Sequence, residues 1–324
     1  MREHAMRHLA LACLCLAAAA CGGDFSNDDL EFLNALPQRE DLAVKLSAAS
    51  EGRSGGGLTT RKDGLVVRLG EASRVSGDTD KTGREFNGAV DGLLSLLENI
   101  RNSSPTSREP DRRVWGPFKD KDHPRFDVRF VMERRELRFD YRLEYRRTGE
   151  GDDAWWALLM GWFQADAGIR KGVGALSLDV KRATEETFPV GGLFTLDRLD
   201  IDYQTKALPT RVEMAFTPRG SLTEPTRYMY REAAGRLGEM RFTLPDIDLV
   251  VGGRLEDVAL TTRWAPDGRG MGVLEVLDGD IKGAKYTECW NALGRVTFLA
   301  RSWDFFNPTE GDRGSCADFS ALDE

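Results

Sequence analysis

The feature that most constrains the fold of this chain is a two-residue alternation that begins near Arg113. Its clearest example is LRFDYRLEYR, residues 137–146. Apolar side chains occupy the odd positions from Leu137 to Tyr145, and Arg, Asp and Glu occupy the even positions. Because successive side chains of a strand point to opposite faces, this stretch predicts a β-strand with one buried and one solvated face.

Comparable short segments follow one another along the chain and are separated by turns rich in Gly, Pro and Asp. The segment before 137–146 places Phe126, Val128, Phe130 and Met132 on one face. The later candidate strands are 154–164, 172–180, 196–203, 211–216, 228–231, 239–244, 255–264, 272–277 and 295–300. This rhythm predicts a mainly β protein built as a large curved antiparallel meander, which forms a half-barrel or a barrel-like sheet.

One amphipathic helix is predicted over about 84–102, so the fold class is α+β with β dominant. Its apolar residues recur at spacings of three and four. They are Phe86, Val90, Leu93, Leu94, Leu97 and Ile100. The preceding DTDKTG, 78–83, resembles the start of an EF-hand loop, but Ala89 stands where that loop needs Glu, so we expect a solvated loop there. No second domain boundary stands out, and 58–324 is predicted to be a single strand-rich domain.

The segment AWWALLMGWF, 154–163, departs from the alternation because it is apolar on both faces. Strict alternation puts Trp155 and Leu159 on one face and Trp156 and Leu158 on the other. A strand of this kind must be covered twice, and the 84–102 helix is the natural cover for one of its faces.

The first 24 residues have the features of an export signal. Two arginines precede an apolar run, 9–20, which is shorter than the roughly 20 residues that a bilayer-spanning helix needs. The run ends in Ala18-Ala19-Ala20-Cys21 and the chain then turns polar. This site resembles the lipobox of bacterial lipoproteins, although Ala18 stands where the family prefers Leu. The resemblance implies that 1–20 is a signal peptide and that Cys21 is lipidated; the alternative is an ordinary signal cleaved near Ala20.

A lipid on Cys21 would anchor the protein in the cell envelope through the membrane. Residues 21–57 are then expected to be a lipidated N-terminus and flexible tether with one short helical piece. Gly22 follows the cysteine, which favours the outer membrane over the inner. The mature chain has no run of basic residues for anionic lipids, so we expect the lipid alone to anchor it. A formal net charge of −8 argues against nucleic-acid partners.

Two cysteines, Cys289 and Cys316, remain beyond the signal and Cys21. An even pair in an oxidising compartment favours a disulfide, and two separate buried thiols are the alternative. His123 is the one histidine of the mature chain and lies in the turn-like KDKDHPRF, and no HExxH, CxxC or Walker motif occurs. We therefore expect no catalytic residues, no metal site and no cofactor, in a protein that is not an enzyme.

Two functions remain open. In the first, the curved sheet binds a lipid or other apolar molecule, with Phe139, Tyr141, Leu143, Trp155 and Trp156 nearest the cavity. A curved sheet with one amphipathic helix resembles, in architecture alone, apolar-ligand carriers such as the Lol-type lipoprotein carriers. The alternative is a structural or partner-binding outer-membrane lipoprotein with a solid core, whose charged outer faces meet other envelope proteins. An enclosed apolar volume of roughly several hundred Å³ would favour the first function, and a filled interior the second.

Overall fold

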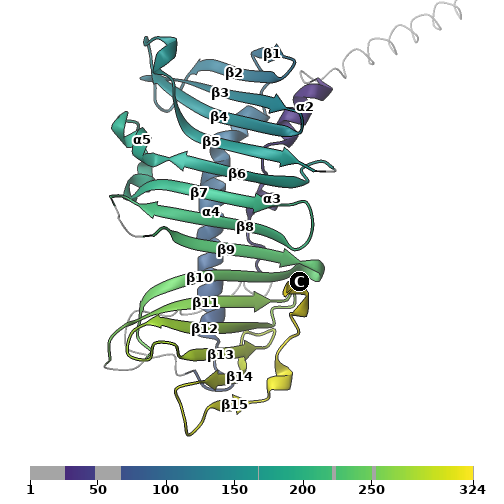
Figure 1. The fold of residues 1–324 in the computed structure, drawn as a ribbon, viewed down its shortest axis with the longest axis vertical. Helices are drawn as coiled ribbons and strands as arrows, with labels where there is room; N and C mark the ends of the chain where they lie inside the picture. Colours follow the sequence, from purple (N-terminus) through teal and green to yellow (C-terminus); the bar gives the residue numbers. More distant parts are fainter. Residues whose placement is uncertain (1–25, 48–66, 167, 221–223, 250–252, 324) are drawn as a thin grey trace, which may run out of the picture.

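The structure, a computed structural model, describes residues 26–47, 67–166, 168–220, 224–249 and 253–323. Cys21, the predicted signal and the linker 48–57 lie outside the described residues, so their roles stay predictions. The described chain forms one continuous sheet with helices on one of its faces (Figure 1). We call the helix-covered face the inner face and the opposite face the outer face.

The sheet has fifteen strands that pair in sequence order, each antiparallel to the next. They are β1 (Ser107–Glu109), β2 (Arg112–Lys119), β3 (Phe126–Arg135), β4 (Arg138–Arg147), β5 (Trp156–Ala165), β6 (Gly172–Asp179), β7 (Leu196–Gln204), β8 (Thr210–Pro218), β9 (Thr226–Ala233), β10 (Leu237–Ile247), β11 (Glu256–Trp264), β12 (Gly270–Asp278), β13 (Lys285–Trp290), β14 (Val296–Arg301) and β15 (Thr309–Gly311). This confirms the predicted antiparallel meander. The sheet is open, because β1 and β15 are its two edges.

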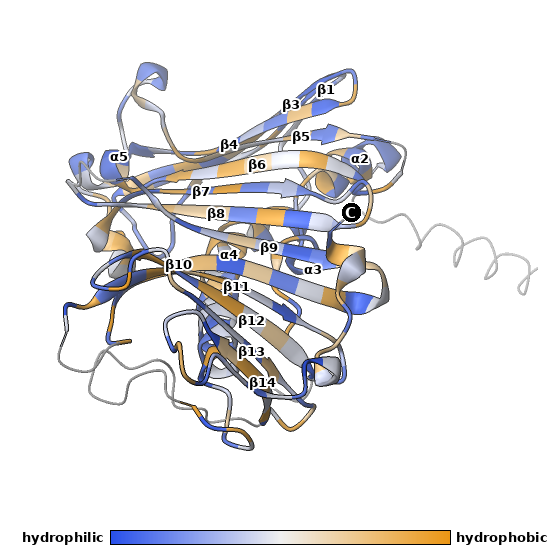
Figure 2. Cartoon of the chain, turned by 60° about the horizontal axis from the view of Figure 1, so that its bottom comes forward, coloured by the Kyte–Doolittle hydropathy of each residue, from blue (hydrophilic) through white to orange (hydrophobic). Residues whose placement is uncertain are grey.

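Polar and apolar residues alternate along the strands, as Figure 2 shows for β8 and its neighbours. In β4 the alternation is the predicted one: Phe139, Tyr141, Leu143 and Tyr145 are buried on the inner face. Strand β13 escaped prediction because the buried Glu288 interrupts its apolar face. Glu288 accepts hydrogen bonds from the Tyr286 hydroxyl at 2.6 Å and from the Ser73 hydroxyl.

The long helix α4 (Arg74–Arg101) runs along the inner face and crosses the strands (Figure 1). It begins ten residues before the predicted start, and the expected loop 78–83 is helical. Ser73 caps the helix by accepting from the Ser76 amide, and Thr79 and Thr82 are buried. Burial under the sheet therefore overrides the low helix propensity of Gly77 and Gly83. The predicted apolar stripe is correct, since Val90 and Leu97 are fully buried.

Three shorter helices complete the described secondary structure that packs on the sheet. They are α2 (Asn27–Asn34), α3 (Arg39–Leu42) and α5 (Val180–Glu185), accompanied by five 3-10 turns at 152–154, 191–195, 234–236, 313–315 and 320–322. Phe32, Leu36 and Leu42 are each 0 % exposed and belong to the main core. The prediction of a flexible tether is therefore wrong for residues 26–47, because their apolar side chains are part of the domain.

A β-bulge in β5 corrects the predicted faces of the two-sided segment. Leu143 pairs with Leu159 and Glu144 with Ala157, so Leu158 is the extra residue. Trp156 consequently shares the inner face with Leu159 and pairs with Tyr145. Trp155 lies on the outer face between the guanidinium groups of two arginines, Arg129 and Arg146.

The inner face contains glycines that lie directly beneath aromatic rings of the neighbouring strand. Tyr141 pairs with Gly161, Tyr203 with Gly174, Trp264 with Gly238 and Trp290 with Gly270. A Cβ atom added at Gly174 would lie 2.3 Å from the Tyr203 ring. Glycine is therefore needed at these positions to let the rings lie flat on the sheet.

The predicted disulfide is present and joins Cys289 of β13 to Cys316 in the C-terminal tail. Beyond it, Phe319 and Leu322 are buried against Ala233 and Ala265. The tail is thus held to the sheet at two places.

Candidate functional site

The outer face contains a trough along β6, where the outward side chains are small. Ala175 lies between Trp162 of β5 and Asp202 of β7. Ser177 lies between Met160 and Asp200 on the same two strands. Because these small residues of β6 lie between larger residues of β5 and β7, a depression with a floor of Ala175 and Ser177 is left between two higher walls.

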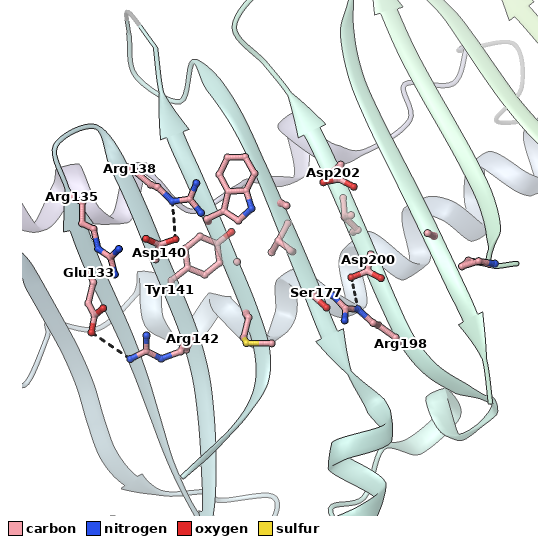
Figure 3. A pocket seen from close by; sticks show the side chains of 18 of the residues that line it. Glu133, Arg135, Arg138, Asp140, Tyr141, Arg142, Ser177, Arg198, Asp200 and Asp202 are labelled. Atoms are coloured by element: carbon pink, nitrogen blue, oxygen red, sulfur yellow. Dashed lines mark hydrogen bonds and ion pairs between the residues drawn. The ribbon is translucent and has the colours of Figure 1, made fainter. Parts of the chain in front are cut away.

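The wall on β3–β5 is built from an aromatic ring and interleaved charges. The Arg138 guanidinium lies 4.4 Å from the centre of the Trp162 ring, and its Nε donates to Asp140 Oδ1 at 3.0 Å. Next to it, Arg142 pairs with Glu133 at 3.4 Å (Figure 3). These pairs hold the long side chains upright beside the trough.

The wall on β7–β9 is acidic at its centre. Arg198 Nε donates to Asp200 Oδ1 at 2.7 Å, but Asp202 forms no ion pair with any residue in the described part of the chain. Its cross-strand neighbour is another carboxylate, Glu213, which is engaged by Arg211 and Arg227. Desolvation raises the pKa of Asp202, and the nearby carboxylates of Glu213 and Asp200 raise it further.

The trough has a volume of about 820 Å³, and its lining includes five arginines and four carboxylates. The charges are therefore nearly balanced, and most are already paired with one another. A second hollow of about 310 Å³ continues the trough past Trp162 and Asp202. The Ser177 hydroxyl on the floor is buried, and none of the described residues hydrogen-bonds to it.

This arrangement can bind but offers little for covalent chemistry. The lining contains no His or Cys, and the described residues hold no group of three or more metal-ligating side chains. What it supplies is an aromatic ring, an unpaired carboxylate, a free hydroxyl and ordered charge pairs of both signs.

The five residues predicted to lie nearest an apolar cavity are not brought together. Phe139, Tyr141, Leu143 and Trp156 are buried on the inner face, whereas Trp155 lies on the outer face. Phe32 of α2 packs edge-on against Phe139, with ring centres 5.4 Å apart. Phe188 fills the space beside Trp156, with ring centres 5.8 Å apart. Of the five, Tyr141 also borders the outer-face trough, at Gly161.

The trough residues themselves were not singled out from the sequence. Ala175 and Ser177 occupy the polar face of GVGALSLD, where small residues carry no distinctive signal. Only the register of β5, β6 and β7 shows that these two residues have larger side chains on either side.

No family model, no curated protein and no solved structure matches this chain. In the part that the structure describes, no helix combines the length and the apolarity needed to cross a membrane.

Proposed function

We propose that the protein is a lipid-anchored binding protein of the bacterial cell envelope, and that it holds a segment of a partner protein in the outer-face trough. One observation carries this proposal. The inner face is largely covered by its own helices and keeps a hollow of about 260 Å³ beside Phe86, Phe216 and Tyr228, while the outer face leaves a larger trough of about 820 Å³.

The chemistry of the trough favours a polypeptide segment over an apolar ligand. Its walls alternate arginine and carboxylate groups, which complement a chain that carries both charges and many amide groups. Asp202 is the natural partner for a lysine or arginine of that segment, because it lies beside Trp162 and has no cation of its own among the described residues.

The anchoring part of the proposal rests on the lipobox at Cys21. Cys21→Ser should move the protein from salt-washed membranes into the soluble fraction. The mass of the wild-type N-terminal peptide should include acyl chains. A bare N-terminal residue, or a variant that stays in salt-washed membranes, would contradict the lipid anchor.

Site-specific crosslinking in cells tests the binding part. A photoreactive residue at Ser177 lies in the trough, and one at Thr243, exposed on β10, is the matched control on the same sheet. We expect an adduct of one defined mass at 177 but not at 243, and at least about tenfold less of it with Asp202→Arg, since a cation there would repel the partner's basic group. Identical adducts at both positions, none at 177, or an adduct that ignores Asp202→Arg would refute the trough as the binding site.

A further inference from the structure

The docking of α2 leaves very little chain between the predicted lipid and the folded domain. Ser26 caps α2, and the buried Asp29 accepts from Arg113 Nε at 2.7 Å and from Arg108 Nε at 3.0 Å. Only four residues separate Cys21 from Ser26. At about 3.5 Å per residue the Cα atoms of Cys21 and Ser26 lie at most roughly 18 Å apart. A lipid on Cys21 would therefore hold the domain against the bilayer surface.

The contacts of α2 also identify which ends of the strands lie next to the bilayer. We call the row of turns at these ends the anchor edge and the row of turns at the opposite ends the far edge. Arg134 donates to Asp28 Oδ1 at 3.0 Å and to the Pro110 carbonyl at 2.9 Å, which ties the first turn of α2 to the β1–β2 and β3–β4 turns. In a meander every second turn lies at the same edge. Among the described residues, the anchor edge therefore consists of the turns 110–111, 136–137, 166 with 168–171, 205–209, 234–236, 265–269 and 291–295; the other described turns between strands form the far edge.

Three consecutive turns of the anchor edge present an aliphatic side chain to solvent. Leu137 is 59 % exposed, Ile169 is 75 % exposed and Leu208 is 58 % exposed. Glu136 and Arg170, which adjoin Leu137 and Ile169, adopt left-handed backbone conformations with φ of 55°. Such conformations are costly for residues other than glycine and are found where a functional turn geometry is maintained.

Basic residues flank these apolar tips. Lys171 and Lys206 are exposed beside Ile169 and Leu208, and Arg135 is exposed beside the β3–β4 turn. Arg170 pairs instead with Asp41 at 3.8 Å, and Arg138 is engaged by Asp140 and Trp162 in the trough wall. The sequence has no basic run, but the meander collects single basic residues from successive turns into one row.

We propose that the anchor edge is a membrane-contact surface, on which Leu137, Ile169 and Leu208 enter the interfacial region of a bilayer that contains anionic lipid. This inference rests on the proposed lipid anchor, which supplies the proximity. An aliphatic side chain in the interface with a basic residue beside it combines apolar burial with attraction to anionic headgroups. The outer-face trough then remains open toward a partner at the membrane surface.

The test uses the mature chain with Cys21→Ser, so that its result does not depend on acylation. An environment-sensitive fluorophore is placed on Ile169→Cys, and the matched control is Phe306→Cys, a residue 93 % exposed on the far edge. With vesicles of phosphatidylethanolamine and phosphatidylglycerol, we expect the emission at 169 to shift to the blue and to be quenched by spin-labelled lipid. The emission at 306 should not change.

A second measurement compares binding of variants to the same vesicles. Leu137→Ser, Ile169→Ser and Leu208→Ser together should weaken co-sedimentation at least about tenfold, because all three apolar contacts are lost. Phe305→Ser with Phe306→Ser should leave it within about twofold. An unchanged signal at 169, a shift at 306 instead, or a triple variant that binds like its parent would overturn the proposal. Failure of the lipid anchor itself is read separately, from the mass of the N-terminal peptide.

Discussion

The two faces of the sheet are made by the same strands, but helices cover one face and the other is open to solvent. On the inner face, aromatic rings lie over glycines and are covered by α2 and α4, so the chain itself fills most of the space and leaves a hollow of about 260 Å³ beside Phe86. On the outer face, arginines and carboxylates pair along and across the strands and leave a trough over the small residues of β6. The comparison shows that alternation separates two surfaces, but the covering helices decide which of them remains available for binding.

Two carboxylates show the same difference in their electrostatics. Asp29, which docks α2 on the inner side, is fully buried, yet hydrogen bonds from Ser26 and Arg108 outweigh desolvation and lower its pKa. Asp202 on the outer face is more exposed, but desolvation and the nearby Glu213 raise its pKa. At Asp29 the hydrogen-bond donors decide the direction of the pKa shift, whereas at Asp202 desolvation is its largest cause.

The largest expected effect is the loss of folding stability when a buried side chain of α2, one of the helices that cover the inner face, is removed. Phe32→Ala removes a fully buried ring that contacts Phe139 and the Arg113 guanidinium, and it should lower the free energy of unfolding by about 3–5 kcal/mol. Leu30→Ala on the same helix, where the side chain is 47 % exposed, is the control and should cost less than about 1 kcal/mol. Denaturant unfolding measures both. Equal, small losses would mean that α2 is not part of the domain core.

A smaller effect is expected where a small aliphatic volume is added to either face of β6. Gly174→Ala places a Cβ against the Tyr203 ring and should destabilise the fold by about 1–3 kcal/mol. Ala175→Val, its neighbour on the outer face, adds volume only to the trough and should change stability by less than about 0.5 kcal/mol. Thermal unfolding of the pair decides the point, and a costly Ala175→Val with a neutral Gly174→Ala would reverse the assignment of the faces.

The smallest effect concerns the unpaired charge of the trough. The folded-state pKa of Asp202 is raised, so the folded protein binds this proton more tightly, and ionisation costs stability as pH rises through that pKa. Asp202→Asn should therefore stabilise the fold at pH 7 by less than about 0.5 kcal/mol, since solvent screens the repulsion. The gain should vanish below the ordinary Asp pKa of 3.8. Melting curves at the two pH values check this, and a gain that persists in acid would exclude repulsion as its cause.

Much of the fold was predictable because its signals are local. Alternation in β4 and the apolar stripe through Val90 and Leu97 each depend on nearby residues, and the structure agrees with both. The errors arose where distant contacts overrode local preference. The helix start at Arg74 depends on burial under the sheet, and the inward Glu288 is tolerated because Tyr286 and Ser73 donate to it. The face of Trp156 depends on a single bulge residue, Leu158.

The candidate site was less predictable than the fold, since a trough forms only where small side chains of one strand lie between larger side chains of the neighbouring strands. Ala175 and Ser177 are ordinary small residues until the register places Trp162, Met160 and two aspartates beside them. The same holds for the anchor edge, where single basic and aliphatic residues gather only because turns alternate between two edges.

The amino-acid sequence by itself determined the antiparallel meander and the amphipathic helix, because strand periodicity and helical spacing are properties of neighbouring residues. It favoured the pairing of Cys289 with Cys316, which the structure shows. The tertiary structure decided which face is covered, where the open trough lies and how short the chain to Cys21 becomes. These features depend on how segments far apart in the sequence pack together. In α2, burying apolar side chains against β4 gives more free energy than the conformational entropy that the chain loses on docking.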